Sequence, residues 1–257
     1  MLKLSHIYKS FNTGRIDEKN LFSDFSIDIN DGEFVSVIGS NGSGKTTMLN
    51  IISGDIKPDG GDVILNGENI TKLANYKRAR RISRVFQNPS NGTCPTMTIF
   101  ENMSIADNKG KSYNLTKGLN NKRKEFYQTR LETLGMGLEN RLGTLTGALS
   151  GGQRQALALI MATLSNPDIL LLDEHTAALD PKSADIVMRL TDSVVSENKI
   201  TTVMITHNLR YAVEYGSRTI MMHDGNAIID VSGNEKDKKT TADYLKVFNE
   251  ISIECGN

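Results

Sequence analysis

The chain has 257 residues, with 30 Lys and Arg against 30 Asp and Glu, no net charge, and 38% hydrophobic residues. This length suits one large α/β domain or two small ones, and the apolar content is enough for a core, which excludes a disordered chain. Zero net charge argues against nucleic-acid binding, because that needs a positive surplus to displace counterions from phosphates. We therefore expect no nucleic-acid partner.

Three further features bear on where the protein works. The longest apolar run, residues 156–162, is shorter than the ~20 residues that span a bilayer, so no membrane span is expected. The N-terminus lacks the apolar core of a signal peptide. Cys94 and Cys255 lie far apart and have no metal-binding spacing. A reduced, cytoplasmic setting is the simplest interpretation.

The first third of the chain has the pattern of a small sheet followed by a glycine-rich loop and a helix. The helix has apolar residues at helical spacing and ends at Gly54. The predicted strands cover residues 2–7, 26–30, 33–38, 63–66 and 81–86, and the predicted helix covers 45–53.

Beyond residue 88 the pattern predicts a helical subdomain inserted into an α/β core. Helices are expected over 122–134 and 152–164, then a continuous apolar strand over 169–172, typical of a strand buried on both faces of a parallel sheet. Alternating elements follow, which favours a parallel α/β fold. They are a helix over 184–195, a strand over 201–205, a hairpin of 219–223 and 227–231 around Asp224-Gly225, a solvated loop over 235–239 and a short final helix.

The strongest local motif lies between the strand at 33–38 and the helix at 45–53. It matches the nucleotide-binding P-loop pattern in the required strand-to-helix context. Its glycines let successive N–H groups point at the α- and β-phosphates, and the helix adds its positive N-terminal end. Lys45 is expected to reach the β- and γ-phosphates, and the Thr46 hydroxyl to bind Mg²⁺. The motif is Gly39-Ser40-Asn41-Gly42-Ser43-Gly44-Lys45-Thr46-Thr47.

A second motif indicates what happens to the bound nucleoside triphosphate. The apolar strand at 169–172 ends in Asp173 and Glu174. A carboxylate at the end of such a strand secures Mg²⁺ in P-loop enzymes, which gives Asp173 the metal role. Glu174 is then the candidate base that polarises the water attacking the γ-phosphate.

Between these motifs, Leu149 is followed by Ser150, Gly151, Gly152 and Gln153. This segment resembles the signature sequence of ATP-binding-cassette (ABC) ATPases. A Ser-Gly-Gly turn that opens a helix presents free N–H groups, which makes a second anion site. The resemblance implies a head-to-tail dimer in which two ATP molecules lie between the P-loop of one subunit and the signature of a second copy.

The resemblance covers about residues 1–235 and implies roles for four more residues. Phe11 resembles the aromatic residue that stacks on adenine, with Tyr8 as the competing choice and a core aromatic as the alternative. Gln87 resembles the glutamine that contacts Mg²⁺ and the attacking water. Asp180 falls in the loop that crosses the dimer interface, and His207 resembles the switch histidine at the γ-phosphate.

Three positions depart from the commonest pattern of the family. His175 stands where many members have Pro, Met161 where Arg is usual, and Asn208 where Asp is common. No catalytic group is lost. Protonation of His175, however, is expected to be able to perturb Glu174.

The resemblance implies an α/β P-loop NTPase with an ABC ATPase core, an N-terminal antiparallel β subdomain and an inserted α-helical subdomain. The expected boundaries are one domain over 1–235, with the helical subdomain at about 88–165, and a C-terminal helix and tail over 236–257. ATP and Mg²⁺ are the expected cofactors.

The expected function is ATP hydrolysis that drives a separate transmembrane permease, as in bacterial importers. The chain resembles the cassettes that accompany branched-chain-amino-acid-type permeases, so the expected solute is an amino acid, and an aromatic amino acid is one option. Residues 95–102 resemble the groove that receives the permease, and an ordinary helix start is the alternative. The complex implies a second copy, an extracellular substrate-binding lipoprotein, and attachment at the cytoplasmic face of the cell membrane. An exporter or lipoprotein-release system and a soluble assembly or scaffold ATPase remain alternatives.

Overall fold

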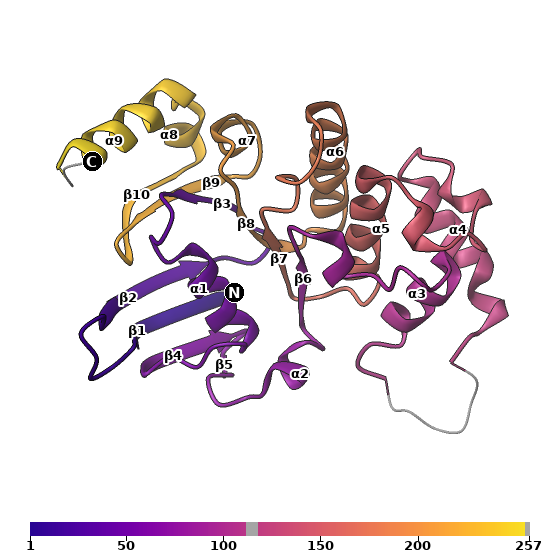
Figure 1. Ribbon diagram of the computed structural model, residues 1–257, viewed down its shortest axis with the longest axis horizontal. Coiled ribbons are helices and arrows are strands. Elements are labelled where there is room, and N and C mark those ends of the chain that lie inside the picture. The colour runs from indigo at the N-terminus through magenta and orange to yellow at the C-terminus, as the bar shows by residue number, and fades with distance from the viewer. Residues whose placement is uncertain (112–117, 255–257) are drawn as a thin grey trace. The chain divides into compact units, whose positions relative to one another are not determined.

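The computed structural model describes residues 1–111 and 118–254, and the chain forms two compact units. The first unit comprises Met1–Arg78 and Lys199–Asn257, and the second comprises Ala79–Asn198 (Figure 1). Cys255 lies outside the described residues, whereas Cys94 is a half-buried free thiol. Within the two described ranges, no helix combines the length and apolarity needed to cross a bilayer.

The first unit contains two sheets and the helices that follow their strands. Its elements are β1 (Leu2–Phe11), β2 (Lys19–Ile29), β3 (Phe34–Gly39), α1 (Lys45–Ser53), β4 (Gly60–Leu65), β5 (Glu68–Asn69), α2 (Asn75–Arg78), β8 (Thr201–Ile205), α7 (Leu209–Glu214), β9 (Arg218–His223), β10 (Asn226–Ser232), α8 (Gly233–Asp237) and α9 (Thr241–Glu254).

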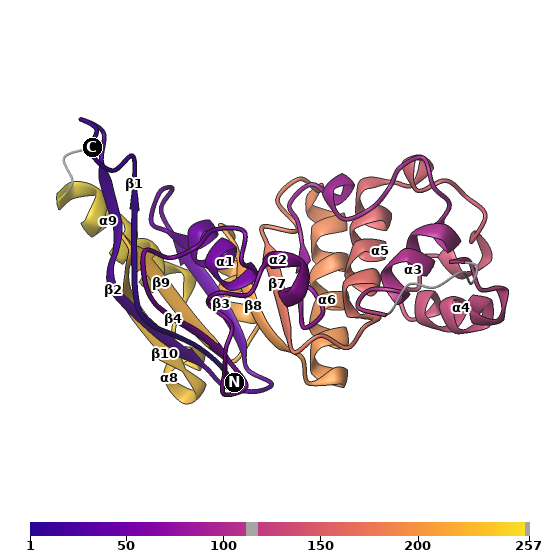
Figure 2. The same ribbon diagram turned by 90° about the horizontal axis from the view of Figure 1, so that it is seen from below.

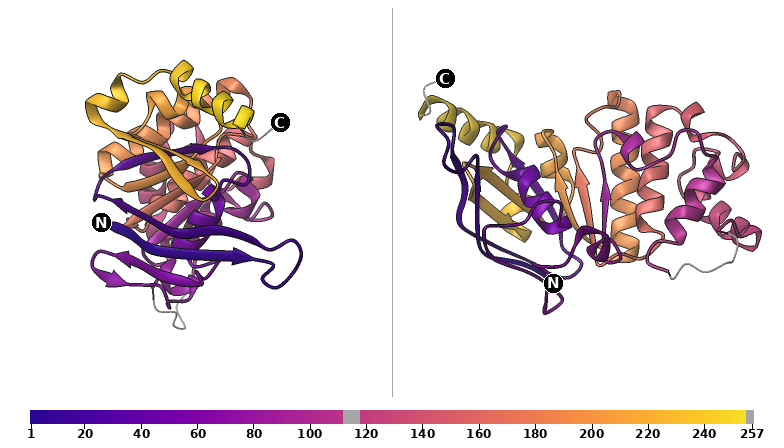
Figure 3. Two further views of the ribbon diagram at one scale, coloured as in Figure 1. Left: turned by 90° about the vertical axis from the view of Figure 1, so that its left-hand side faces the viewer. Right: turned by 60° about the horizontal axis from the view of Figure 1, so that its bottom comes forward.

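The antiparallel sheet of this unit has the strand order β2-β1-β4-β5. In β2, buried Phe25, Ile27 and Ile29 alternate with exposed residues, the period expected of a sheet with one covered face. The turn between β1 and β2 lies at the end of a long hairpin, seen in the left panel of Figure 3. In the register of this hairpin, Phe11 pairs with Lys19.

The second sheet of the unit is built around β3, whose residues are all buried. β3 pairs in parallel with β8 on one side and with β9 on the other. β9 and β10 form the predicted antiparallel hairpin around Asp224 and Gly225, both of which have positive φ. Continuous apolar strands are required here because both faces of the parallel core are covered.

The predicted solvated loop over residues 235–239 is a helix in its first part and has one buried side chain, whereas Glu235, Asp237 and Lys238 are exposed as expected. Residues Gly233–Asp237 form α8, and Lys236 is only 4% exposed, with its Nζ donating a hydrogen bond to the Val213 carbonyl at 2.7 Å. Burial lowers the pKa of Lys236. A charge-rich composition does not by itself predict exposure, because the aliphatic part of a lysine can pack among apolar groups when its ammonium donates a hydrogen bond to a carbonyl.

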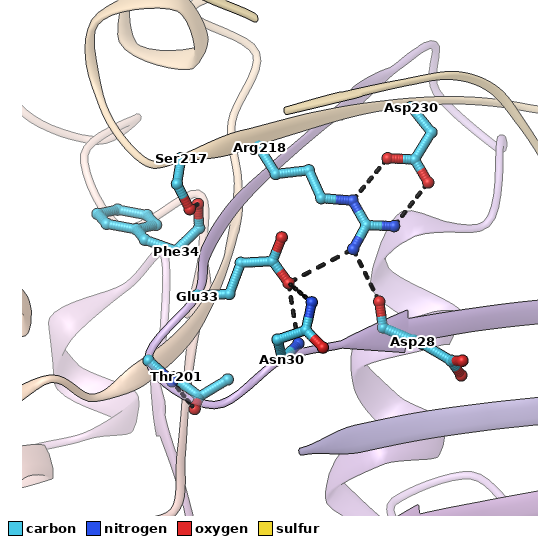
Figure 4. A network of polar contacts seen from close by, with 9 residues as sticks. Asp28, Asn30, Glu33, Phe34, Thr201, Ser217, Arg218 and Asp230 are labelled. Carbon is cyan, nitrogen blue, oxygen red and sulfur yellow. Dashed lines mark hydrogen bonds and ion pairs between the residues drawn. The ribbon is translucent and has the colours of Figure 1, made fainter. Parts of the chain in front are cut away.

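A charged network fastens the two sheets of this unit together (Figure 4). Arg218 of β9 makes a bidentate ion pair with Asp230 of β10, with both N–O distances at 2.6 Å. Its Nη1 donates to the Asp28 carbonyl at 2.8 Å and lies 3.4 Å from Glu33 Oε2. Asp230 is the main reason that the pKa of Arg218 is raised. One guanidinium therefore joins β2, the start of β3 and the β9–β10 hairpin.

The second unit combines two strands with a helical cluster. Its elements are β6 (Ile82–Val85), α3 (Ile99–Asp107), α4 (Lys124–Glu132), α5 (Gly151–Thr163), β7 (Ile169–Asp173) and α6 (Pro181–Asn198), with short 3₁₀ turns at Pro89–Asn91, Asn121–Arg123, Leu138–Asn140 and Thr146–Ala148.

In this unit β6 and β7 pair in parallel, with Ile82 opposite Ile169. α5 and α6 pack side by side, as Figures 1 and 2 show. The helical core includes Met103, Tyr127 and Leu157, all 1% exposed or less. The expected helical subdomain of residues 88–165 falls within this unit, and its boundaries stay predictions.

Helix α3 begins within residues 95–102, the segment that resembles a permease groove and for which a helix start is the alternative. Thr98 and Glu101 form a full capping box at its start: the Thr98 hydroxyl accepts from the Glu101 N–H, and the Glu101 carboxylate accepts from the Thr98 N–H at 2.7 Å. This motif ends the Asn/Ser/Thr-rich stretch at residue 98. A helix start is thus what the structure shows within residues 95–102.

Candidate functional site

The glycine-rich loop lies between β3 and α1, as predicted. Gly39, Gly42 and Gly44 have φ values of 150°, 79° and 105°. A Cβ on Gly39 would lie 2.2 Å from the Met222 carbonyl oxygen, and one on Gly44 would lie 2.9 Å from the Phe22 ring. Glycine is therefore required at both positions, by backbone conformation and by space.

Lys45 is buried at the first position of α1, with 5% of its surface exposed. Its Nζ donates to the carbonyl oxygens of Gly39 and Ser40, both at 2.8 Å. Thr46 is exposed beside it and Thr47 is half-buried. The loop thus holds a buried ammonium next to exposed backbone and an exposed threonine, an arrangement that suits a polyphosphate.

His207 lies near the beginning of this loop. It follows buried β8, and its side chain is exposed. A pocket of about 320 Å³ brings it together with the first P-loop residues, and its contact with the γ-phosphate stays a prediction. The pocket is lined by Ile38, Gly39, Ser40, Asn41, Thr206, His207, Leu209 and Phe248. Asn208, at the position where Asp is common in the family, caps α7 by accepting from the Arg210 N–H at 3.0 Å.

Phe11 and Tyr8 are the two candidates for stacking on a base. Phe11 is half-buried at the end of β1, and Lys9 Nζ lies 5.5 Å from its ring centroid. Tyr8 is 46% exposed, and a Cβ on Gly60 would lie 3.2 Å from its ring. Phe11 therefore lies beside the turn of the β1–β2 hairpin, whereas the more exposed Tyr8 lies against Gly60 of β4.

In the second unit, Asp173 ends β7. Its Oδ2 pairs with Arg84 Nη2 of β6 at 2.5 Å, and both side chains are largely buried. Glu174 follows with a φ of 47°, in the left-handed region that non-glycine residues rarely adopt. Such strain persists where the surroundings impose it and clusters at functional sites.

His175 is not protonated at neutral pH, so the expected effect of its protonation on Glu174 concerns acid conditions alone and stays a prediction. His175 is 1% exposed, and burial lowers its pKa to about 4. The Thr191 hydroxyl donates to the Val187 carbonyl at 2.8 Å, so at the 3.1 Å contact with His175 Nε2 it must accept. The ring is therefore neutral, with its proton on Nε2.

The signature residues open α5. Ser150 is its N-cap: the Ser150 hydroxyl accepts from the Gln153 N–H at 3.3 Å, and Gln153 Oε1 accepts from the Ser150 N–H at 3.2 Å. Ser150 and Gly151 are exposed, while Gly152 is buried against Ser183 of α6. The first turn of α5 therefore presents its N-terminal end, as predicted for an anion site.

Sequence reasoning gave no role to Arg154, yet it supports this turn. Its Nε donates to the Thr146 carbonyl at 3.1 Å, and its Nη2 donates to the carbonyls of Gly147 and Leu149 at 3.0 and 3.2 Å. A cation in the first turn of a helix opposes the helix dipole, and this misplaced charge is the signal that could have identified it.

Gln87 and Asp180 are both exposed in the second unit. The carbonyl before Gln87, that of Phe86, accepts a hydrogen bond from Gln155 at 3.0 Å, which fixes the segment. Asp180 caps α6 by accepting from the Ser183 N–H at 3.1 Å, and hydrogen bonds from Ser183 lower its pKa. Asp180 thus has a structural role besides its predicted place at a dimer interface.

The predicted site residues fall into one group in each unit. The first unit holds Phe11, the P-loop and His207, and the second holds Gln87, the signature, Asp173, Glu174 and Asp180. A P-loop on a parallel β3 core defines a nucleotide-binding protein of the P-loop NTPase class.

The family follows from comparison with known proteins. The family model described as ABC transporter matches residues 22–177, and the chain belongs to this family. The chain is 51% identical to the "Tyrosine transport ATP-binding protein" of Clostridioides difficile strain R20291, over 96% of this chain and 98% of that relative. It is 33% identical to the ABC transporter ATP-binding protein YxdL of Bacillus subtilis, over 100% of this chain and 95% of that relative.

Solved structures agree. The ADP conformation of MJ1267, an ATP-binding cassette of an ABC transporter, matches with a TM-score of 0.81 and 26% identity, covering 100% of this chain and 99% of that one. The dimeric post-hydrolysis state of the cassette MJ0796 with ADP and phosphate matches with a TM-score of 0.73 and 32% identity, covering 90% and 98%. The predicted ABC ATPase fold is confirmed: the chain is an ATP-binding, ATP-hydrolysing transporter subunit, of a kind that dimerises and works with a transmembrane permease.

Proposed function

We propose that this subunit drives the import of an aromatic amino acid through a separate permease at the cytoplasmic face of the cell membrane. The similarity to the tyrosine transport ATP-binding protein, 51% identity over nearly the full length of both chains, carries this proposal. A receptor lipoprotein outside the membrane would deliver the solute. The substrate never touches this chain, so its identity depends on the permease and receptor.

In the proposed site, the P-loop and Phe11 bind ATP. The ring of Phe11 stacks on the base, and backbone N–H groups of residues 39–47 cradle the phosphates. Lys45 adds a positive charge from within the loop. Ser150, Gly151, Gly152 and Gln153 of a second copy close over the γ-phosphate with the N-terminal end of α5.

Mg²⁺ fits the proposed donor set. Thr46, Gln87 and Asp173 offer a hydroxyl, an amide and a carboxylate oxygen, and hard oxygen donors suit this ion. Among the described residues there is no cluster of three or more His, Cys, Asp or Glu that could hold a metal. The remaining ligands of the ion would be phosphate oxygens and water. Bound there, it would neutralise charge on the β- and γ-phosphates.

Glu174 is the proposed base. Its strained backbone fixes the start of its side chain at the end of β7, and its carboxylate would accept the proton of the attacking water. His207 would contact the γ-phosphate, and Gln87 would orient the water while its segment, with residues 95–102, meets the permease. Asp180 would couple the two sites across the dimer.

The test is transport by the assembled complex. The tagged subunit is purified with its membrane partner, reconstituted in proteoliposomes with ATP on its own side, and assayed for uptake of labelled tyrosine, phenylalanine and leucine. ATP-dependent uptake of tyrosine or phenylalanine above leucine is expected, and none with Glu174→Gln. Efflux of solute or release of lipoprotein would instead support the exporter class, and co-purification of soluble proteins alone would support a scaffold role.

A further inference from the structure

Lys19 occupies a position that the sequence did not single out. It is the first residue of β2 and is exposed. In the β1–β2 register it stands directly opposite Phe11. Side chains of directly opposed residues in an antiparallel pair lie on the same face of the sheet, with Cβ atoms about 4.5–5.5 Å apart. Lys19 therefore shares a face with the proposed base-stacking ring.

The ammonium of Lys19 also reaches the P-loop. A Cβ built on Gly42 would lie 3.7 Å from Lys19 Nζ. Gly42 is exposed and has positive φ, so its backbone forms the outer part of the loop that faces a phosphate chain. A single residue of β2 thus connects the face of Phe11 to the middle of the phosphate-binding loop.

In the described part of the chain, no neighbouring carboxylate forms an ion pair with the Lys19 ammonium. The adjacent carboxylates are engaged elsewhere in the turn: Glu18 accepts from the Gly14 N–H at 2.8 Å, and Asp17 accepts from Asn12 Nδ2 at 2.7 Å. Within residues 1–111 and 118–254, Lys19 makes no side-chain hydrogen bond or ion pair. Lys9 on the neighbouring strand, by contrast, pairs with Asp59 at 2.7 Å.

We propose that Lys19 is a second cationic contact for the triphosphate of ATP, acting from strand β2 beside Lys45 of the P-loop. Lys45 is held inside the loop by two carbonyls, whereas Lys19 approaches from the hairpin that carries Phe11. Phe11 would then bind the base and Lys19 the phosphates, and the two residues face each other in the β1–β2 pair. This inference rests on the proposed nucleotide site and is independent of the transported solute.

The experiment separates phosphate contact from base contact. Dissociation constants are measured for MgATP and for inorganic tripolyphosphate, which has phosphates and no base. In Lys19→Gln, both constants are expected to rise about fivefold at low salt, or about 1 kcal/mol. The loss should shrink at high salt because an exposed contact is screened. In Phe11→Ala only the MgATP constant should rise.

The matched control is Lys3→Gln, a half-buried lysine of the same sheet that pairs with Asp28 at 3.3 Å. It is expected to leave both constants unchanged, and Lys19→Arg is expected to restore them. Unchanged binding in Lys19→Gln, or an equal loss in Lys3→Gln, would overturn the inference. So would weakened MgATP binding with unaltered tripolyphosphate binding. If Lys45→Met also bound both ligands normally, the P-loop assignment itself would fail.

Discussion

In the first unit, the predicted phosphate-binding residues are held mainly by the backbone. Three glycines give the loop its course, two carbonyls fix Lys45, and the buried strand β3 leads into the loop. In the second unit, the corresponding residues are held by side chains. Arg154 binds three carbonyls before the signature, Gln155 fixes the segment of Gln87, and Asp173 pairs with Arg84.

This difference matters for function. The backbone of the P-loop has its phosphate-binding conformation before the nucleotide binds, whereas the side chains of the second unit support residues with proposed roles in hydrolysis. Preorganised donors cost no reorganisation when charge appears. We therefore expect substitutions in the first unit to weaken nucleotide binding, and substitutions in the second to slow turnover while binding persists. Variants of Glu174, Lys45 and Arg154 test this contrast, and a variant of His175 tests how burial of a titratable ring affects stability. They are taken from the largest expected effect to the smallest.

Glu174→Gln should lower ATP turnover by about 10³-fold, the scale of losing a general base, while the dissociation constant for MgATP stays within about twofold. Phosphate release and equilibrium binding measure the two effects. Glu125→Gln, an exposed glutamate on α4, is the matched control and should change neither. Near-normal hydrolysis in Glu174→Gln would remove Glu174 from the role of base.

Lys45→Met should raise the dissociation constant for MgATP about 100-fold, or about 2.7 kcal/mol, because a buried cation that faces phosphates is lost. Equilibrium binding by fluorescence measures it. The Gly39 and Ser40 carbonyls lose a donor as well, so thermal unfolding is followed to confirm that the fold persists. If Lys45→Met is folded and its dissociation constant for MgATP rises less than threefold, the first unit does not have the expected role in nucleotide binding.

His175 should make the protein less stable in mild acid. The unfolded chain takes up a proton on this ring near pH 6.5 and the folded chain only near pH 4, so between these values the unfolded state binds more protons. Stability therefore falls as pH drops through this window, by about 2 kcal/mol at pH 5. Urea unfolding at pH 7 and pH 5 compares the protein with His175→Gln, which keeps a donor for Thr191 but does not titrate. An equal loss in both proteins would show that His175 is not responsible.

Arg154→Met should lower turnover about tenfold with MgATP binding unchanged, since the carbonyls before the signature lose their donors while the P-loop is untouched. The control is Arg141→Met, an exposed arginine of the same unit. Steady-state hydrolysis and binding are measured together. If MgATP binding by Arg154→Met weakened as much as its turnover, the second unit would contribute to binding as well as to hydrolysis, and the expected contrast would fail.

Local patterns predicted much of the fold. The helix at residues 45–53 and the strand at 201–205 have the predicted bounds, because glycine, apolar period and β-branched content act over a few residues. The burial of Lys236 was not predicted, because it depends on a carbonyl of α7 that is distant in sequence. The predicted site residues have the local settings that their motifs require, and their catalytic roles stay predictions.

Sequence alone determined the family, the P-loop, and the order of motifs that an ABC ATPase needs, because these are encoded in short segments whose spacing is fixed by the chemistry. Only the tertiary structure showed that Arg218 joins two sheets, that Arg154 supports the signature turn, that His175 is neutral, and that Lys19 reaches Gly42. Each of these depends on which side chain meets which carbonyl, ring or loop after folding, and on how far burial removes a charge from water.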